Sequence, residues 1–170
     1  MQNHLHRKRP RSSKGFTLIE MLVVMGIIAA LAGIVIIAVN PAKQFAQARN
    51  TERQAGLNAI LNAVGQRMTD NKGVFAGSFT VGGSTYACPQ LPTAAAGISS
   101  QNGIDLSCLT PTYLSTQLPV DPNGGSWTSA LSYASAYTVA ADALGRVTVC
   151  APNAAGEATI PGAAPICVTR

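Results

Sequence analysis

The feature that most constrains this chain is a long apolar stretch near its N-terminus, from Phe16 to Val39. Its 24 residues contain one charged side chain, Glu20. At about 1.5 Å per residue, a helix of this length reaches about 36 Å, which exceeds the roughly 30 Å of a bilayer's hydrocarbon core. The stretch therefore predicts a helix that crosses a membrane.

The segment before this stretch is basic. It holds five of the chain's twelve Lys and Arg residues and none of its seven acidic residues. These five are Arg7, Lys8, Arg9, Arg11 and Lys14. By the positive-inside rule this flank stays in the cytoplasm and the C-terminal part is exported. Because the rest of the chain is neutral, the net charge of +5 gives no argument for nucleic-acid binding.

The lone acid in the apolar stretch needs an explanation. A carboxylate inside a bilayer costs about 3 kcal/mol even on lenient insertion scales, so an acid there marks a functional residue by default. The plain alternative is a single-pass anchor with a stray acid. Glu20 lies in the first turns of the stretch, directly after the Lys14–Gly15 junction, and this placement favours the functional interpretation.

The order of the parts differs from that of an ordinary secretory signal. In such a signal a small-residue cleavage site follows the apolar stretch. Here a small residue, Gly15, precedes the stretch. A cut after Gly15 would remove residues 1–15 as a leader, keep the helix, and leave a free α-amine on Phe16.

The residues from Lys14 to Glu20, Lys-Gly-Phe-Thr-Leu-Ile-Glu, resemble the class III signal of type IV pilins and type II secretion pseudopilins. The resemblance is close to Val39 and continues in pattern to Met68. It implies that a membrane aspartic peptidase cuts between Gly15 and Phe16 and that the new N-terminus is methylated. It also implies that Glu20 pairs with the Phe16 amine of a neighbouring subunit, a contact that low dielectric strengthens.

The helix is expected to be interrupted where the apolar stretch ends. Pro41 removes a helical hydrogen bond and clashes one turn back, which predicts a kink or a loosened turn over Ile37–Asn40. A simple kink at the membrane exit and a segment that melts on filament assembly, as the resemblance implies, both remain open.

Beyond Pro41 the pattern is again helical, to about residue 70. One apolar stripe predicts a face that packs on the rest of the chain: Leu57, Ile60, Leu61, Val64 and Met68. Polar residues lie off this stripe: Arg49, Glu52, Arg53, Asn58, Asn62 and Arg67. Gly56 and Gly65 each weaken the helix by about 1 kcal/mol relative to alanine.

Residues 71–170 predict a small β-rich head. Gly82-Gly83 is a two-residue hairpin signal. The expected strands are Ser78–Val81, Ser84–Ala87, Tyr133–Ala140 and Arg146–Ala151, and a short helix is expected within Thr110–Gln117, starting at Pro111. The fold class is therefore α+β: a long N-terminal helical spine on a small antiparallel head. Its parts are the leader (1–15), the membrane or filament-core helix (16–39), the amphipathic continuation (40–70) and the head (71–170).

The four cysteines all lie in the part predicted to be exported, and no two of them form a Cys-x-x-Cys pair. A four-thiolate zinc site lacks its usual spacing, whereas two disulfides fit an oxidising exterior. Of three connectivities we favour the short loops, Cys88–Cys108 and Cys150–Cys167. Each would contribute about 3 kcal/mol in the chain-entropy account. The resemblance implies that the second ties down the C-terminal tail.

Candidate ligand sites in the head are few. Asp121, Asn123 and Ser126 offer oxygen ligands that resemble a calcium loop of some pseudopilins, although an ordinary turn explains the same residues. The aromatic residues Trp127, Tyr133 and Tyr137 either pack in the core, the favoured interpretation, or form an exposed face for sugars, surfaces or DNA. The remaining carboxylates, among them Asp105, Asp142 and Glu157, are scattered along the chain.

The sequence gives no support for catalysis. His4 and His6 both lie in the leader, so the mature chain has no histidine for Ser-His-Asp or Cys-His chemistry. We expect no enzyme and no cofactor.

What the resemblance implies instead is a filament subunit. It would be held in the cytoplasmic membrane by one span with its head outside, processed by the prepilin peptidase/N-methyltransferase, and assembled with its own copies and other pilins by a platform and ATPase. Its destination would be an extracellular pilus or a periplasm-spanning pseudopilus. Four cysteines and a sizeable head favour a pilus over a pseudopilin of a secretion or DNA-uptake machine. A membrane-anchored binding module that never polymerises is the third hypothesis.

Overall fold

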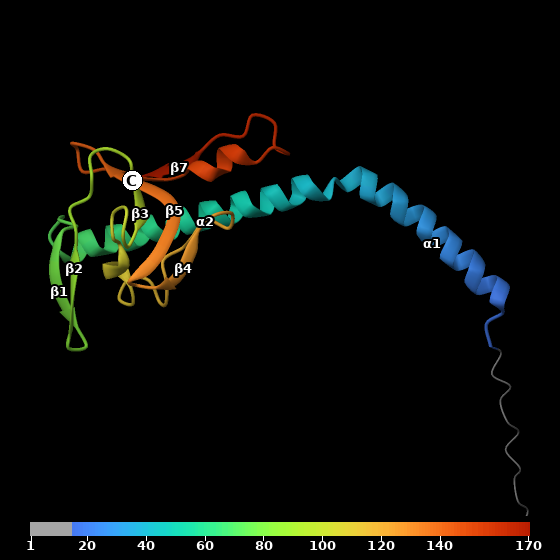
Figure 1. Ribbon diagram of the computed structural model, residues 1–170, viewed down its shortest axis with the longest axis horizontal. Helices are drawn as coiled ribbons and strands as arrows, with labels where there is room; N and C mark the ends of the chain where they lie inside the picture. Colours follow the sequence, from blue (N-terminus) through green and yellow to red (C-terminus); the bar gives the residue numbers. More distant parts are fainter. Residues whose placement is uncertain (1–14) are drawn as a thin grey trace, which may run out of the picture. The chain divides into compact units, whose positions relative to one another are not determined.

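The computed structural model describes residues 15–170, and the predicted leader apart from Gly15 lies outside the described residues. The described chain contains two long helices, seven strands and two short 3-10 turns (Figure 1). It divides between Pro41 and Ala42 into two compact units, which are described in turn. The α+β class expected from the sequence is confirmed.

The first unit is dominated by α1, Leu18–Val39. Thr17 precedes it with extended backbone (φ −78°, ψ 153°) and acts as its N-cap. Asn40 follows it in the left-handed conformation (φ 45°, ψ 79°), which ends the helix, and the next helix starts at Pro41. Asparagine tolerates positive φ, and proline is suited to a first helical position, where its missing N–H has no helical partner anyway. The interruption therefore lies at Asn40.

The second unit is built on α2, Pro41–Asp70. Its apolar stripe is buried in one core with the sheet: Leu57, Ile60, Leu61 and Val64 from the helix, and Tyr137, Val139 and Val149 from the strands. Gly56 has a packing reason, because a Cβ there would lie 3.1 Å from Pro119 Cβ and 3.2 Å from Tyr137 Oη. Glycine lowers the helix propensity at this position, but it allows Pro119 and Tyr137 to pack closely against the helix backbone.

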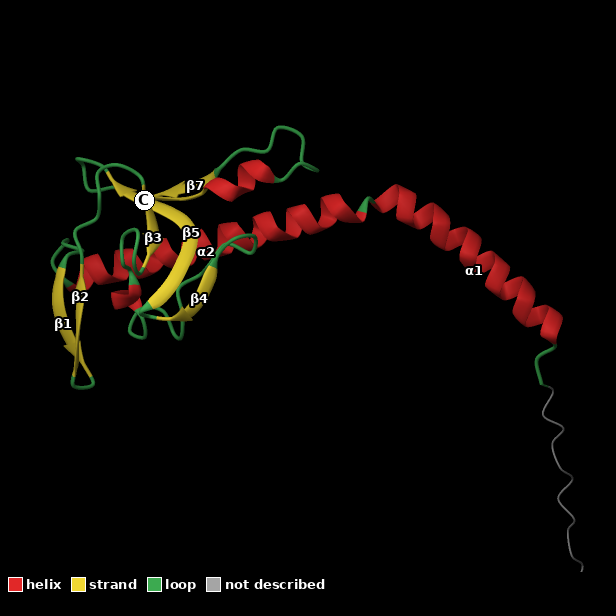
Figure 2. Ribbon diagram, in the orientation of Figure 1, coloured by secondary structure: helices red, strands yellow, loops and turns green. Residues whose placement is uncertain are grey.

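Two sheets form the head. β1 (Gly77–Val81) and β2 (Ser84–Cys88) make the predicted hairpin, with Gly82 and Gly83 both at positive φ as a two-residue turn of the primed type requires. This hairpin lies at the C-terminal end of α2 (Figure 1). The second, five-stranded sheet is antiparallel and lies over α2 (Figure 2). Its strands are β3 (Ala96–Ser99), β4 (Ser126–Ser129), β5 (Ser132–Ala141), β6 (Val147–Ala151) and β7 (Ile166–Thr169).

The long strand β5 organises this sheet. β3 pairs with β5, β4 pairs with its first part, β6 pairs with its last part, and β7 pairs with β6. Disulfides join Cys88 to Cys108 and Cys150 to Cys167, with Cα–Cα separations of 5.4 and 4.1 Å. The first links β2 to the 3-10 turn η1 (Ser107–Leu109), and the second joins directly opposed residues of β6 and β7.

The prediction of a helix starting at Pro111 is wrong. Thr110 before the proline is extended (φ −97°, ψ 142°), as steric contact with a following proline favours, and η1 ends at Leu109. The backbone N–H groups of Tyr113 and Leu114 then both donate to the Leu109 carbonyl. This closes a turn instead of starting a helical ladder.

Candidate functional site

The predicted cleavage junction lies in exposed, non-helical backbone. Gly15 and Phe16 both precede the first helical residue, Leu18, and the Phe16 side chain is 85 % exposed. A Cβ added at Gly15 would meet no described atom within 4 Å. The peptide bond between the two residues is therefore exposed and outside the helix.

Glu20 belongs to a capping box at the start of α1. Its Oε2 accepts hydrogen bonds from the backbone N–H and the hydroxyl of Thr17, both at 2.8 Å. In return the Thr17 hydroxyl oxygen accepts a hydrogen bond from the Glu20 N–H at 3.3 Å. This reciprocal arrangement satisfies backbone donors that the first turn of a helix otherwise leaves open. The acid thus has a local structural role in the uncut chain.

The other carboxylate oxygen of Glu20 remains available. Oε1 accepts no hydrogen bond from residues 15–170 in the structure. Apolar side chains line the surface around the carboxylate, among them Phe16, Ile19 and Val23. An ionised carboxylate can accept from several donors at once, so the capping box leaves room for a cation at Oε1.

The rest of α1 offers a continuous apolar surface. None of its residues is buried within the described chain. Its 22 residues are long and apolar enough to cross a membrane. A helix that is apolar all round needs lipid or other helices around it.

In the head, a buried arginine of α2 that lies off the predicted apolar stripe forms four hydrogen bonds. Arg53 of α2 is fully buried. Its Nε and Nη2 donate to the two oxygens of Asp121 at 2.8 and 3.1 Å, which is the bidentate arrangement that suits guanidinium and carboxylate. Its Nη1 donates to Glu157 at 2.6 Å and to Asn50 at 2.7 Å.

Glu157 completes this charged cluster by accepting from two arginines. Besides Arg53, it receives hydrogen bonds from Arg49 Nε at 2.9 Å and from Arg49 Nη2 at 2.5 Å. These bonds, from Arg49 first and Arg53 second, lower the pKa of Glu157 to about 2. The cluster of Arg49, Arg53, Asp121 and Glu157 attaches α2 to the loop before β4 and to the segment after the 3-10 turn η2 (Pro152–Gly156).

The structure accounts for Asp121, the only carboxylate of the calcium candidate, in another way. Both oxygens accept from Arg53, and Oδ1 also accepts from the Asn123 backbone N–H at 2.8 Å. Ser126 is exposed at the start of β4. Within residues 15–170 no three His, Cys, Asp or Glu side chains are grouped so that they could hold a metal ion.

A second buried arginine lies farther along α2. Arg67 donates from Nη2 to the Gly77 carbonyl at 3.1 Å, and its guanidinium lies 4.4 Å from the centroid of the Phe79 ring. Such a cation–π contact in a desolvated site is worth about 2 kcal/mol. Arg67 therefore attaches the β1–β2 hairpin to the C-terminal end of α2.

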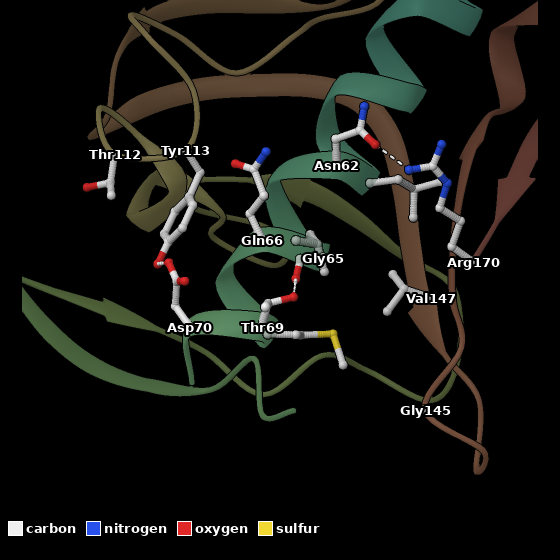
Figure 3. Close-up of a pocket in the computed structure, with 13 residues that line it drawn as sticks. Asn62, Gly65, Gln66, Thr69, Asp70, Thr112, Tyr113, Gly145, Val147 and Arg170 are labelled. Carbon is white, nitrogen blue, oxygen red and sulfur yellow. Dashed lines mark hydrogen bonds between the residues drawn. The ribbon is translucent and has the colours of Figure 1, made fainter. Parts of the chain in front are cut away.

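An open groove of about 790 Å³ follows the uncovered face of α2 (Figure 3). The helix contributes Asn62, Gly65, Gln66 and Thr69. Hydrogen bonds join both rims to the helix: Tyr113 donates to Asp70 at 3.0 Å, and the Arg170 guanidinium donates to Asn62. The polar side chains at each edge of the groove are thus hydrogen-bonded to residues of α2, and these bonds hold both edges in place.

The three aromatic residues divide between core and surface. Tyr133 and Tyr137 are 5 % and 1 % exposed, in agreement with the favoured core interpretation. Burial is the main cause that raises the pKa of Tyr137 to about 12. Trp127 is half-buried and packs on Tyr133 with ring centroids 4.9 Å apart.

The capping box and the charged cluster were not predicted from the sequence. The capping box could have been predicted, because its signature, Thr17-x-x-Glu20 ahead of an apolar run, is present in the sequence. The charged cluster has none, because Arg53 lies 68 residues from Asp121 and 104 from Glu157 along the chain.

Comparison with known protein families places a match at the N-terminal end of the chain. Residues 10–36 match the prokaryotic N-terminal methylation motif, and of these, residues 15–36 lie in the described part of the chain. Searches of curated proteins and of solved structures found no match to the chain. The match covers the junction after Gly15, Glu20 and most of α1.

Proposed function

We propose that this chain, whose N-terminal segment is the class III signal of type IV pilins and pseudopilins, is a structural subunit of a type IV pilus-like surface filament. The observation that carries the proposal is the position of the motif. It spans an exposed non-helical junction, a capped helix start and an apolar helix with no buried residue. Such a helix requires lipid first and other helices afterwards.

Processing is the first step of the proposed function. The prepilin peptidase cuts between Gly15 and Phe16 and removes the leader 1–15, and the Phe16 amine is then methylated. Exposure of Phe16 supports this step. N-terminal sequencing and intact mass of the mature protein should give a chain that begins at Phe16 with one added methyl group. A chain that begins at Met1, or beyond Val39, would contradict the proposal.

Assembly is the second step. The new amine of Phe16 carries a positive charge, and we propose that it pairs with Glu20 of a neighbouring subunit to set the axial register. The free Oε1 of Glu20 and its apolar surroundings support this role, because an ion pair is stronger where water is excluded. The capping box and the intersubunit pair use different oxygens, so both are compatible in one carboxylate.

Two matched variants separate these roles of Glu20. Glu20→Gln keeps a side chain that can complete the capping box but removes the charge. Thr17→Ala removes the cap and keeps the charge. If the charge pair sets assembly, Glu20→Gln abolishes or strongly reduces filaments while Thr17→Ala assembles. If Glu20→Gln assembles as the wild type does, Glu20 is only a helix cap and the proposed pairing is wrong.

The parts of the chain have the following roles in this proposal. Residues 16–39 form the membrane and then filament-core helix, residues 40–70 continue it with a break at Pro41, and residues 71–170 form a head outside the membrane. The partners are other copies and other pilins, the peptidase and the assembly platform with its ATPase. Filaments sheared from cells and probed for this chain distinguish a surface pilus from a periplasmic pseudopilus, which stays with the cell.

A further inference from the structure

We propose that a groove between β2, η1 and β4 binds a neutral carbohydrate. This inference concerns the head alone and does not depend on filament assembly. The groove has a volume of about 370 Å³, within the range of small-molecule sites. Two aromatic rings and four hydroxyl side chains line it: Tyr86, Trp127, Ser107, Thr110, Thr116 and Ser129.

The two aromatic rings are held in place from behind. Trp127 packs on Tyr133 with centroids 4.9 Å apart, and Tyr86 stacks on Phe79 with centroids 5.6 Å apart. Both Trp127 and Tyr86 remain half-buried, so each ring keeps surface for a ligand. The negative face of an aromatic ring attracts weakly polarised C–H groups, such as those on the flat face of a pyranose.

The hydroxyl side chains of the groove can form hydrogen bonds with the hydroxyl groups at the edge of the same sugar ring. Thr110 donates to the Ser107 carbonyl, but the hydroxyls of Ser107 and Thr116 form no hydrogen bond with any described residue. A hydroxyl both donates and accepts, which suits a ligand whose own polar groups are hydroxyls. No charged side chain is among the described residues that line the groove, so the ligand is neutral.

The wall that carries Ser107 is fixed before any ligand binds. Tyr133 Oη donates to Asp105 Oδ1 and accepts from the Leu106 N–H, both at 2.8 Å. Asp105 Oδ1 also accepts from the Ser107 N–H at 2.8 Å. The Cys88–Cys108 disulfide joins this wall to β2, which carries Tyr86. A preformed groove loses less conformational entropy on binding.

A proline-rich peptide is the other ligand that aromatic grooves commonly take. Proline has no N–H, so such a peptide offers mainly carbonyl acceptors to the groove. The groove has several hydroxyls able to accept as well as donate. Hydroxyls that both donate and accept favour a ligand that also has donors and acceptors, and a sugar has both.

The chain contains its own probe, because Trp127 is its only tryptophan. The full chain in lauryldimethylamine oxide micelles, which contain no sugar headgroup, is titrated with cellobiose, maltose, lactose and N,N′-diacetylchitobiose. We expect a saturable change in tryptophan emission with at least one of them. No saturable change with any of the four overturns the proposal, and saturation with a decaproline peptide alone assigns the groove to peptides instead.

Variants place the binding in this groove. The double variant Ser107→Ala/Thr116→Val removes two hydroxyls and should raise Kd about tenfold, the effect expected for two modest hydrogen bonds. Ser115→Ala removes an exposed hydroxyl next to Thr116 but outside the groove and should leave Kd unchanged. An unchanged Kd in the double variant would show that the sugar binds elsewhere.

Discussion

At the scale of single residues, two carboxylates have different surroundings. Glu20 is exposed and completes a helix cap, whereas Glu157 is 4 % exposed and accepts from two arginines. Glu20 was expected to be special because one acid in an apolar stretch is visible in the sequence. Glu157 was not, because its partners come from α2, more than 100 residues earlier in the chain.

The lowered pKa of Glu157 predicts a specific acid sensitivity. Its pKa falls from an ordinary 4.5 to about 2 in the folded chain. The stabilisation is therefore complete above about pH 4.5 and is lost as the pH falls toward 2. Glu157→Gln should lower the free energy of unfolding at pH 7 by about 2 kcal/mol, the value of a hydrogen bond to a charged group. Urea unfolding between pH 7 and pH 2 measures both effects.

Glu52→Gln is the matched control, since Glu52 is exposed on the same helix. It should leave the free energy of unfolding at pH 7 unchanged. If Glu157→Gln keeps the wild-type loss of stability in acid, Glu157 is not the source of that loss.

At the scale of elements, the apolar stripe predicted the buried face of α2, but it did not predict the two arginines that flank it. Burial of Arg53 and Arg67 follows from acceptors and a ring that other elements bring to the helix. The hairpin was foreseen because Gly82-Gly83 selects its turn. The strands β3, β4 and β7 were not, because they are four residues each; β3 and β7 are fixed by pairing with strands farther along or back in the chain, and β4 by a hairpin with β5.

The two interior glycines of α2 provide a test of this packing. Gly65 lies open in the groove of Figure 3, with no atom near its missing Cβ. Gly65→Ala should raise the free energy of unfolding by about 1 kcal/mol, the difference in helix propensity. Gly56→Ala gains the same propensity but presses on Pro119 and Tyr137, so it should be net destabilising. Urea unfolding of both variants measures these changes. Equal effects of the two substitutions on the free energy of unfolding would contradict the prediction.

At the scale of the whole molecule, the α+β class and the helix break near Pro41 could be read from the sequence. These features depend on local chemistry: hydrophobic length, proline geometry and turn glycines. The charged cluster and the order of strands depend on contacts between distant segments, which no local pattern encodes. The helix expected after Pro111 failed for the same reason, since the chain turns back to the Leu109 carbonyl.

The disulfides act on the head as a whole. Non-reducing peptide mapping of the exported protein should find Cys88 with Cys108 and Cys150 with Cys167, without free thiol. Replacing both Cys150 and Cys167 by serine should lower the free energy of unfolding by about 3 kcal/mol, because the unfolded chain loses a loop constraint. A map with other pairs, or four alkylatable thiols, would contradict this expectation.

The order of contacts along α2 has a mechanical consequence. Arg49 and Arg53 follow the buried Ala46 and precede the apolar stripe that starts at Leu57, so tension that enters the head from the N-terminal end of α2 reaches the ion pairs before this stripe. Ion pairs respond to protons, and apolar packing does not. Acid that protonates Glu157 should therefore lower the pulling force at which the head begins to separate from its helix, while the apolar half of the joint keeps its strength.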